Sequence, residues 1–118
     1  MLPAASRLTH RDEFSEVVRH GRRSGRTRLV VHVRRSPGSS RPRAGFVVSK
    51  AVGGSVVRHR VVRRLREIVR PRLAGLPPDL AMVVRALPPA ATASSAELAV
   101  DLDGALSAAL RKLPGGVR

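Results

Sequence analysis

The sequence predicts a small α+β domain in which helix, strand, strand, helix, strand and helix follow one another, with the helices on one face of a mixed sheet. Two observations support this fold class. Apolar residues recur with a period typical of strands in two segments and with a period typical of amphipathic helices in three others, and one further short segment is apolar almost throughout. Capping residues and turn-forming Gly and Pro separate these segments. The chain has 118 residues, which suits one hydrophobic core, so residues 1–118 are predicted to form a single domain.

The first helix is predicted over about residues 10–20. Thr9 is a suitable N-cap, and Asp12 three residues later gives an approximate capping box. Gly21 is a typical residue to follow a helix. The Gly-, Ser- and Arg-rich residues 22–28 are predicted to be a basic connector.

Three short segments are predicted to be strands. Apolar and more polar residues alternate over residues 29–34, and a second strand is expected over residues 44–49. Because the residues between them, 36–42, are rich in turn formers, these two strands are predicted to pair as an antiparallel hairpin. Residues 80–85 are apolar almost throughout, as expected of a strand that is buried on both faces.

The last helix is predicted over residues 96–113. Ser94 and Glu97 have the spacing of a capping box, and Gly115 lies beyond the expected end. One face of this helix carries an apolar stripe that is expected to face the core: Leu98, Leu102, Leu106, Ala109, Leu110 and Leu113.

Residues 49–72 are the most informative segment, a loop that leads into a strongly basic amphipathic helix. Ser55 is a suitable N-cap after two glycines, and Pro71 is expected to end the helix, which is therefore predicted over about residues 56–69. At 100° per residue, valine, leucine and isoleucine share one arc. A solvated helix face usually mixes both signs of charge, but the opposite arc here carries a single acid, Glu67, among five basic residues. It is therefore expected to bind anions through His59, Arg60, Arg63, Arg66 and Arg70.

The composition points to a polyanionic partner. The formal net charge is +15, and residues 17–66 contain fifteen Lys or Arg and no Asp or Glu. Most of the basic residues are arginine, which forms bidentate contacts with phosphate and stacks on bases. There is no cysteine, so disulfides and thiolate chemistry are excluded. No apolar run approaches the roughly 18 residues of a membrane span, and no signal-peptide pattern is present, so a cytoplasmic protein is expected.

The acidic residues and histidines do not form a recognisable catalytic or metal site. Asp101 and Asp103 lie two apart on a predicted helix and should not converge, and the four histidines lack the spacing of metal ligands. A nuclease acting alone would need such a cluster. We therefore expect no catalytic and no metal-binding residues in this chain, and any reaction would depend on groups supplied by another molecule.

Residues 49–66 resemble the signature of the protein subunit of bacterial ribonuclease P: a strand that ends in Ser-Lys, a Gly-Asn loop, and Arg-Asn-Arg with further basic residues along a helix. Ser49-Lys50 and the arginines match this pattern, whereas Gly54 and His59 stand where the family usually has Asn. Length and element order are similar across nearly the whole chain. The resemblance implies an RNA-binding surface formed by Lys50, Gly53, Gly54, Arg58, His59, Arg60, Arg63 and Arg66.

The resemblance also implies a function and a topology. In the family, the RNA subunit is the catalyst and holds most of the Mg2+, and the protein binds this RNA and the 5′ leader of precursor tRNA to promote endonucleolytic maturation of tRNA 5′ ends. The fold would be ribosomal protein S5 domain 2-like, with a left-handed strand-helix-strand crossover where the general rule predicts a right-handed one. The leader would lie in a cleft between the first helix and the sheet, which maps onto Phe14, Val18, Leu29 and His32.

Two other functions fit the charge and the fold class. A ribosomal protein or another rRNA-binding module without a catalytic role would have the same composition. A DNA-compacting protein is the third candidate, although the chain shows no basic tail and no dimerisation signal.

Overall fold

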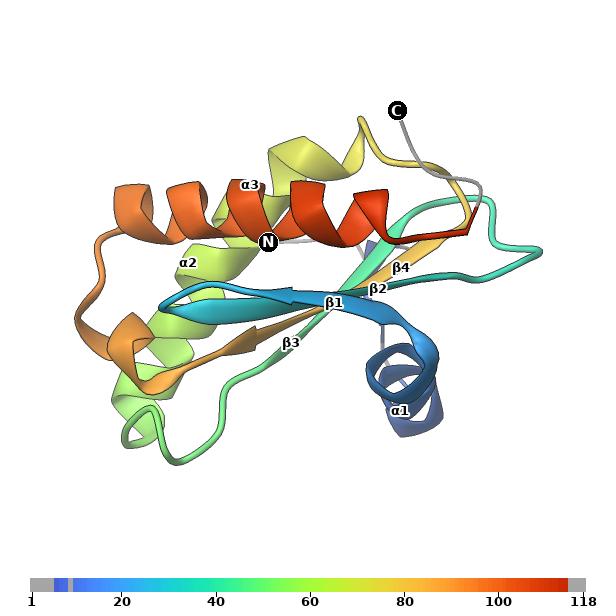
Figure 1. Ribbon diagram of the computed structural model, residues 1–118. Helices are drawn as coiled ribbons and strands as arrows, with labels where there is room; N and C mark the ends of the chain where they lie inside the picture. Colours follow the sequence, from blue (N-terminus) through green and yellow to red (C-terminus); the bar gives the residue numbers. More distant parts are fainter. Residues whose placement is uncertain (1–5, 9, 115–118) are drawn as a thin grey trace.

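The computed structural model describes residues 6–8 and 10–114. It confirms an α+β domain with a mixed sheet and contains one strand more than the sequence predicted (Figure 1). The elements are α1 (Arg11–His20), β1 (Arg22–Gly25), β2 (Leu29–Arg35), β3 (Arg43–Val47), α2 (Ser55–Leu73), β4 (Leu80–Ala86), the short 3-10 helix η2 (Pro88–Thr92) and α3 (Ser95–Arg111).

The strand order is β1-β2-β4-β3, so the predicted hairpin of the strands now seen as β2 and β3 is wrong. β4 lies between them and pairs with β2 in antiparallel fashion and with β3 in parallel fashion. Six of its seven residues are buried, and only Arg85 is exposed. The most apolar strand takes a central position because helices cover both faces of the sheet there.

β1 forms in a segment that the sequence predicted to be a connector. It pairs along its whole length with β2, from Arg22 opposite Val33 to Gly25 opposite Val30. Ser24 is its one buried residue. This short, polar edge strand shows no alternation of apolar residues. Its extended conformation is therefore determined by its pairing with β2 and not by its own sequence.

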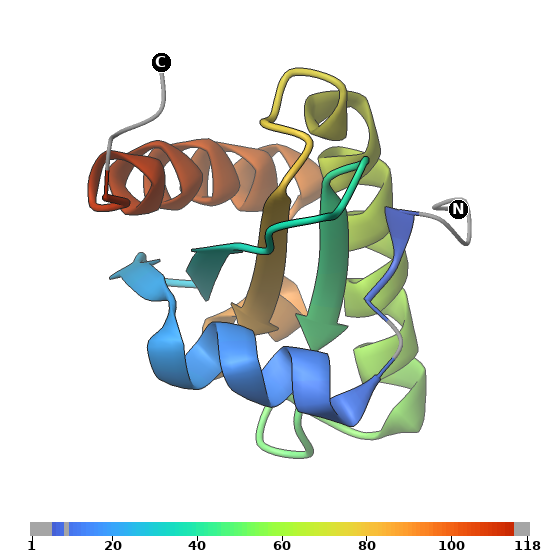
Figure 2. The same cartoon turned by 90° about the vertical axis from the view of Figure 1, so that its right-hand side faces the viewer.

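The helices cover both faces of the sheet, which corrects the prediction that they share one face. α2 and α3 lie on one face, and α1 lies on the other (Figures 1 and 2). The larger core is between the sheet and the α2–α3 pair. A smaller cluster, made of Leu8, Val17, Ala81 and Val83, holds α1 to the opposite face.

The β3–α2–β4 connection is left-handed, as the resemblance implied. In Figure 2 the two parallel strands point the same way, β4 lies to the left of β3, and α2 returns behind the sheet. This connection presents one side of α2 to solvent beside β3, which is an edge strand of the sheet. None of the helices in the described part of the chain is long and apolar enough to cross a bilayer.

Two helix ends differ from the predictions. α2 begins one residue early, with Gly54 as its N-cap, and it continues through Pro71 to Leu73. A proline in the last turn removes a single backbone hydrogen bond. The extra turn buries Leu73. α1 begins at Arg11 with His10 as its N-cap, and the predicted cap Thr9 lies outside the described residues.

The predicted start of the last helix is confirmed in detail. The Glu97 N–H donates to Ser94 Oγ over 3.1 Å, and the Ser94 N–H donates to Glu97 Oε1 over 2.9 Å. These two bonds form the capping box of α3. α3 ends at Arg111, and Gly115 lies outside the described residues.

Candidate nucleic-acid interface

α2 is oriented by its buried stripe, which decides where its basic residues lie. Val61, Leu65, Ile68, Val69 and Leu73 are buried against the larger core. The helix therefore presents its other arc outward, with His59 and Arg63 exposed and Arg58, Arg60 and Arg66 half-buried. We call Lys50 and these five α2 residues the basic ridge.

Ion pairs in the described part of the chain join carboxylates to arginines that are not members of the basic ridge. The pairs are Arg28 with Glu97 and Asp101, Arg34 with Glu16, Arg35 with Asp79, Arg43 with Glu13, and Arg72 with Asp103. Within the described residues, no member of the basic ridge has an ion pair, although the exposed Glu67 follows Arg66 on the same helix. The guanidinium groups of the ridge therefore remain available to an anionic ligand.

Two arginines of α2 instead bind backbone carbonyl groups. Arg60 Nη2 donates to Ala91 O over 3.2 Å, and Arg64 Nη1 donates to Ala93 O over 2.9 Å. A carbonyl carries no net charge, so these bonds hold both side chains against η2 and its end without removing their charge. Arg60 keeps further N–H groups that can bind phosphate oxygens.

The loop before α2 is shaped by its two glycines. At Gly53 a Cβ would lie 2.9 Å from Val57 Cγ1, so a side chain there would collide with the first turn of α2. Gly54 has open space around its Cα and gives α2 no side-chain cap. Free N–H groups at a helix start can bind phosphate oxygens. Lys50 is exposed in the same loop.

The four residues predicted to line the leader cleft do not all lie together. Phe14 is half-buried and Val18 is 41% exposed, and both are on α1. Leu29 is wholly buried in the larger core, on the face of the sheet away from α1, so it does not line a cleft beside α1. His32 lies three residues after Leu29 on β2. Because side chains alternate between the two faces along a strand, His32 is on the face that α1 covers.

His32 is 2% exposed, and neither ring nitrogen has a hydrogen-bond partner among the described residues. Burial lowers the pKa of His32, and the charges of Arg85 and Arg23 lower it further. The imidazole is therefore neutral near neutral pH. In this state it forms part of the sheet surface under the two arginines and offers no stacking face to a ligand.

Three basic residues near these surfaces were missed by the sequence analysis. Arg85 and Arg23 lie close enough to His32 to affect its pKa. Arg85 could have been found as the one charged residue in the apolar 80–86 segment. Arg7 forms a bridge to Ala44 at the outer edge of β3, in a segment for which no element was predicted.

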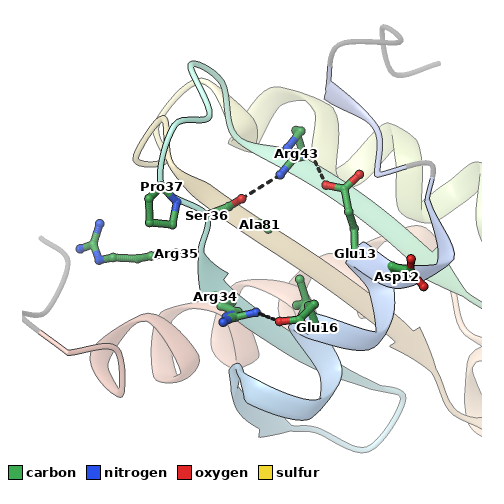
Figure 3. A pocket seen from close by; sticks show the side chains of 10 residues that line it. Asp12, Glu13, Glu16, Arg34, Arg35, Ser36, Pro37, Arg43 and Ala81 are labelled. Atoms are coloured by element: carbon green, nitrogen blue, oxygen red, sulfur yellow. Dashed lines mark hydrogen bonds and ion pairs between the residues drawn. The ribbon is translucent and has the colours of Figure 1, made fainter.

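The hollow in Figure 3 is lined by residues of both signs and differs from the basic ridge. It has a volume of about 270 Å³ and lies where α1 meets the end of β2. Glu16 binds Arg34, and Glu13 binds Arg43, which also donates to Ser36 Oγ. The hydrogen bond and charge of Arg34 lower the pKa of Glu16. These pairs attach α1 to the sheet and leave little free charge for a ligand.

The carboxylates that the sequence analysis considered for catalysis are separated. Asp101 accepts from the backbone N–H of Arg28 over 3.1 Å, whereas Asp103 binds Arg72 at the end of α2. The sheet carries a basic ridge that has no ion pair among the described residues, and this ridge lies beside a glycine loop with free helix N–H groups. This arrangement defines a nucleic-acid-binding protein.

Comparison with known proteins identifies the family. A family model described as Ribonuclease P matches residues 2–110. The chain belongs to this family. Similar proteins named ribonuclease P protein component include one from Streptomyces avermitilis, 56% identical over the whole of both chains, and one from Mycolicibacterium paratuberculosis, 48% identical over 98% of each.

Solved structures agree on the fold. The RNase P protein of Staphylococcus aureus superposes with a TM-score of 0.81 at 22% identity, over 88% of this chain and 94% of that one. The RNase P protein of Thermotoga maritima gives a TM-score of 0.72 at 24% identity, over 83% of this chain and 92% of that one.

Proposed function

We propose that this chain is the protein subunit of ribonuclease P. In this role residues 1–118 act as one RNA-binding domain that holds the catalytic RNA and the 5′ leader of precursor tRNA, and the RNA subunit performs the cleavage. This role implies a cytoplasmic location, where precursor tRNA is processed. The single observation that carries the proposal, beside family membership, is that the basic ridge has no ion pair within residues 6–8 and 10–114.

The basic ridge and the 49–54 loop are proposed to bind phosphates of the catalytic RNA. Lys50 and the α2 arginines can replace condensed cations on the RNA, and the released counter-ions favour binding. The N–H groups at the start of α2, next to Gly53 and Gly54, can hold one phosphate. His59 is exposed beside them and can donate or accept a hydrogen bond.

The leader is proposed to lie on the α1 face of the sheet. Phe14 and Val18 would contact it from α1. Its phosphates would be near Arg23 and Arg85, and His32 would support the sheet surface beneath them. We do not assign Leu29 to this surface because it is buried on the other face.

The protein is proposed to assist Mg2+ without binding it directly. Phosphates of the catalytic RNA and of the substrate repel one another, and cations must offset that repulsion before the two can approach. Arginines on the protein supply part of this positive charge, so less Mg2+ is required in solution. The reacting metal ions would be held by RNA oxygens.

Reconstitution tests the proposal. The purified chain alone should cleave no precursor tRNA. Added to a bacterial ribonuclease P RNA at a magnesium concentration at which that RNA is inactive, the chain should restore cleavage at the mature 5′ end. Absence of restoration, together with preferential binding to ribosomal RNA, would support the rRNA-binding alternative instead.

A further inference from the structure

The outer edge of β1 lies on the opposite side of the molecule from the basic ridge. The strand order β1-β2-β4-β3 puts β1 at one edge of the sheet and β3, beside α2, at the other. In Figure 2, β1 and the C-terminal end of α3 lie to the left, and α2 lies to the right. Arg22, Arg23, Gly25 and Arg26 are exposed along the β1 edge.

The backbone of β1 turns two residues toward this edge. In an antiparallel pair, successive residues direct their N–H and C=O groups alternately toward the partner strand and away from it. The Arg26 N–H donates to Leu29 O on β2 over 2.8 Å. Arg23 and Gly25, which are three residues and one residue earlier, therefore direct their N–H groups away from β2. Neither N–H has an acceptor among the residues that the structure describes.

Cations occupy the two carbonyl groups that point the same way. Lys112 Nζ donates to Arg23 O over 2.7 Å, and Arg26 Nη1 donates to Gly25 O over 2.8 Å. Arg26 also reaches α3, where its Nη2 donates to Gly104 O over 2.9 Å. A Cβ at Gly104 would lie 2.9 Å from Arg26 Nε, so a glycine in the middle of α3 makes room for this guanidinium.

The positive charge along this edge has no internal counter-ion in the described part of the chain. The three acidic residues of α3 pair with Arg28, in the turn between β1 and β2, or with Arg72 on α2. Arg22, Arg26 and Lys112 form no ion pair within residues 6–8 and 10–114. We call these three side chains and the N–H groups of Arg23 and Gly25 the β1-edge surface.

The β1-edge surface suits an extended polyanion better than another β-strand. A pairing strand requires donors and acceptors along the edge. Both acceptors here are already bonded to Lys112 and Arg26, whereas both donors are free. The two free N–H groups lie about 6.8 Å apart, which is the length of two residues in an antiparallel strand. Each N–H can donate to an oxygen of a separate anionic group on one extended chain.

We infer that the β1-edge surface binds the phosphate backbone of RNA, apart from the basic ridge. The N–H groups of Arg23 and Gly25 donate to phosphate oxygens, and the nearby cations offset the phosphate charge. Phosphate contacts carry no direct sequence information, so this binding is independent of base identity. The inference rests on the proposed function, which gives the chain RNA partners. With the basic ridge, it lets the chain hold two RNA segments from opposite edges of the sheet.

The phosphates could belong to the catalytic RNA or to precursor tRNA, and amide hydrogen exchange distinguishes them. Exchange at Arg23 and Gly25 is measured by mass spectrometry in the free protein, with catalytic RNA, and in the holoenzyme with precursor tRNA. Both amides should exchange at least about tenfold more slowly in one of the complexes, as expected of hydrogen bonds to a charged group. The RNA whose addition first slows the exchange supplies the phosphates.

Gly38, an exposed glycine in the loop between β2 and β3, is the control for this measurement. Its exchange should stay the same in all three samples. Unchanged exchange at Arg23 and Gly25 in both complexes, or equal slowing at Gly38, would overturn the inference. Slowing in the free protein that increases with protein concentration would also overturn it, because a second copy of the chain would then occupy the edge.

Arg22→Gln provides a second test that leaves β1 attached to α3. The Arg22 side chain forms no hydrogen bond or ion pair within the described chain, so its loss removes charge alone. For the RNA that slows the exchange, the slope of log K against log salt should become shallower by about 0.7–0.9 for the lost phosphate contact. The matched control is Arg111→Gln, because Arg111 donates to Ser107 Oγ on α3 and should leave the slope unchanged.

Lys112 adds a conservative comparison. Lys112→Gln should reduce the slope, and Lys112→Arg, which keeps the charge and a donor, should not. Equal slopes in wild type, Arg22→Gln and Lys112→Gln would overturn the inference. Failure of wild-type protein to restore cleavage would refute the proposed function. Restored cleavage with unchanged exchange and unchanged slopes would refute only the β1-edge contact.

Discussion

Arg72 on α2 and Asp103 on α3 form a two-point contact between the helices: Arg72 Nε lies 2.5 Å from Asp103 Oδ1, and Nη2 lies 3.0 Å from Oδ2. Arg72 follows Pro71, so the contact exists because α2 continues past the proline. It also shows how charge is distributed in this chain. Acidic side chains pair with arginines that join structural elements, and the basic ridge remains free to bind another molecule.

Asp103→Asn should therefore have a small effect on stability and none on RNA affinity. Asp103 is 56% exposed, so the pair is worth about 0.5 kcal/mol of unfolding free energy. The hydrogen bond from Arg72 lowers the pKa of Asp103. The ion pair therefore contributes to the unfolding free energy at pH values above the pKa of Asp103 in the unfolded chain. This contribution is lost as the pH falls through the lower pKa of Asp103 in the folded protein. Urea unfolding of both proteins at neutral and acid pH measures this; a difference that grows on acidification would contradict it.

Removing charge from the basic ridge should weaken RNA binding and reduce its salt dependence. In the triple variant Arg60→Gln, Arg63→Gln and Arg66→Gln, the slope of log K against log salt should fall by at most about 0.9 for each lost phosphate contact. A salt titration of catalytic-RNA binding measures it. The matched control is Arg111→Gln on α3, an exposed arginine whose loss should leave the slope almost unchanged. Equal slopes for the triple variant and wild type would exclude α2 as the contact surface.

Gly54→Asn should stabilise the protein. Gly54 is the N-cap of α2, has no side-chain cap to offer, and has open space around its Cα. An asparagine would accept a hydrogen bond from the first turn, worth a few tenths of a kcal/mol relative to glycine. Gly53→Asn is the contrasting variant, because its Cβ would meet Val57, and it should be destabilised. Thermal unfolding compares the two, and equal shifts would refute the argument.

His32→Leu should stabilise the protein by about 1 kcal/mol, because it removes a buried imidazole whose two nitrogens have no hydrogen-bond partner in the described part of the chain. The effect should depend on pH. The folded state lowers the pKa of His32, so below about 6.5 the unfolded chain binds more protons and wild-type stability falls. The advantage of the variant should therefore increase as the pH falls from 7 to 5. An advantage that shrinks over this range would mean that the folded state raises the pKa.

Gly21→Ala should be strongly destabilising. A Cβ at this position would lie 2.3 Å from Val17 O and 2.5 Å from Val33 O, and both are backbone atoms that cannot rotate away. The link between α1 and β1 would have to shift, at a cost of about 2 kcal/mol or more. Chemical unfolding measures this. Gly25→Ala is a suitable control because its nearest neighbour would be a Val30 side-chain atom at 3.8 Å.

Local features were predictable from the sequence. The capping box of α3 and the basic arc of α2 depend on residues within a few positions of one another, and both predictions hold. His59, Arg60, Arg63 and Arg66 of the proposed RNA surface follow from that arc, whereas Lys50, Gly53, Gly54 and Arg58 follow from the resemblance to the family. Their freedom from ion pairs could not be predicted, because it depends on where distant acids such as Asp103 find their partners.

Non-local features were not predictable in the same way. The apolar character of residues 80–85 indicates burial, but it does not say between which strands they lie. β1 has no periodicity of its own and forms because β2 offers a free edge. The face on which Leu29 lies was predictable, unlike the strand order. Leu29 and His32 are three residues apart on one strand, so their side chains cannot point to the same face. Alternation alone could have excluded Leu29 from the cleft.

The central position of β4 has a consequence for synthesis on the ribosome. β2 and β3 are both made well before β4, the strand to which each must bond. Until residue 86 has left the exit tunnel, the sheet cannot close, and the nascent segment already carries most of the arginines of the chain. Translation thus holds an unfolded polycation beside ribosomal RNA, and this exposure ends only when the sheet closes after β4 has emerged.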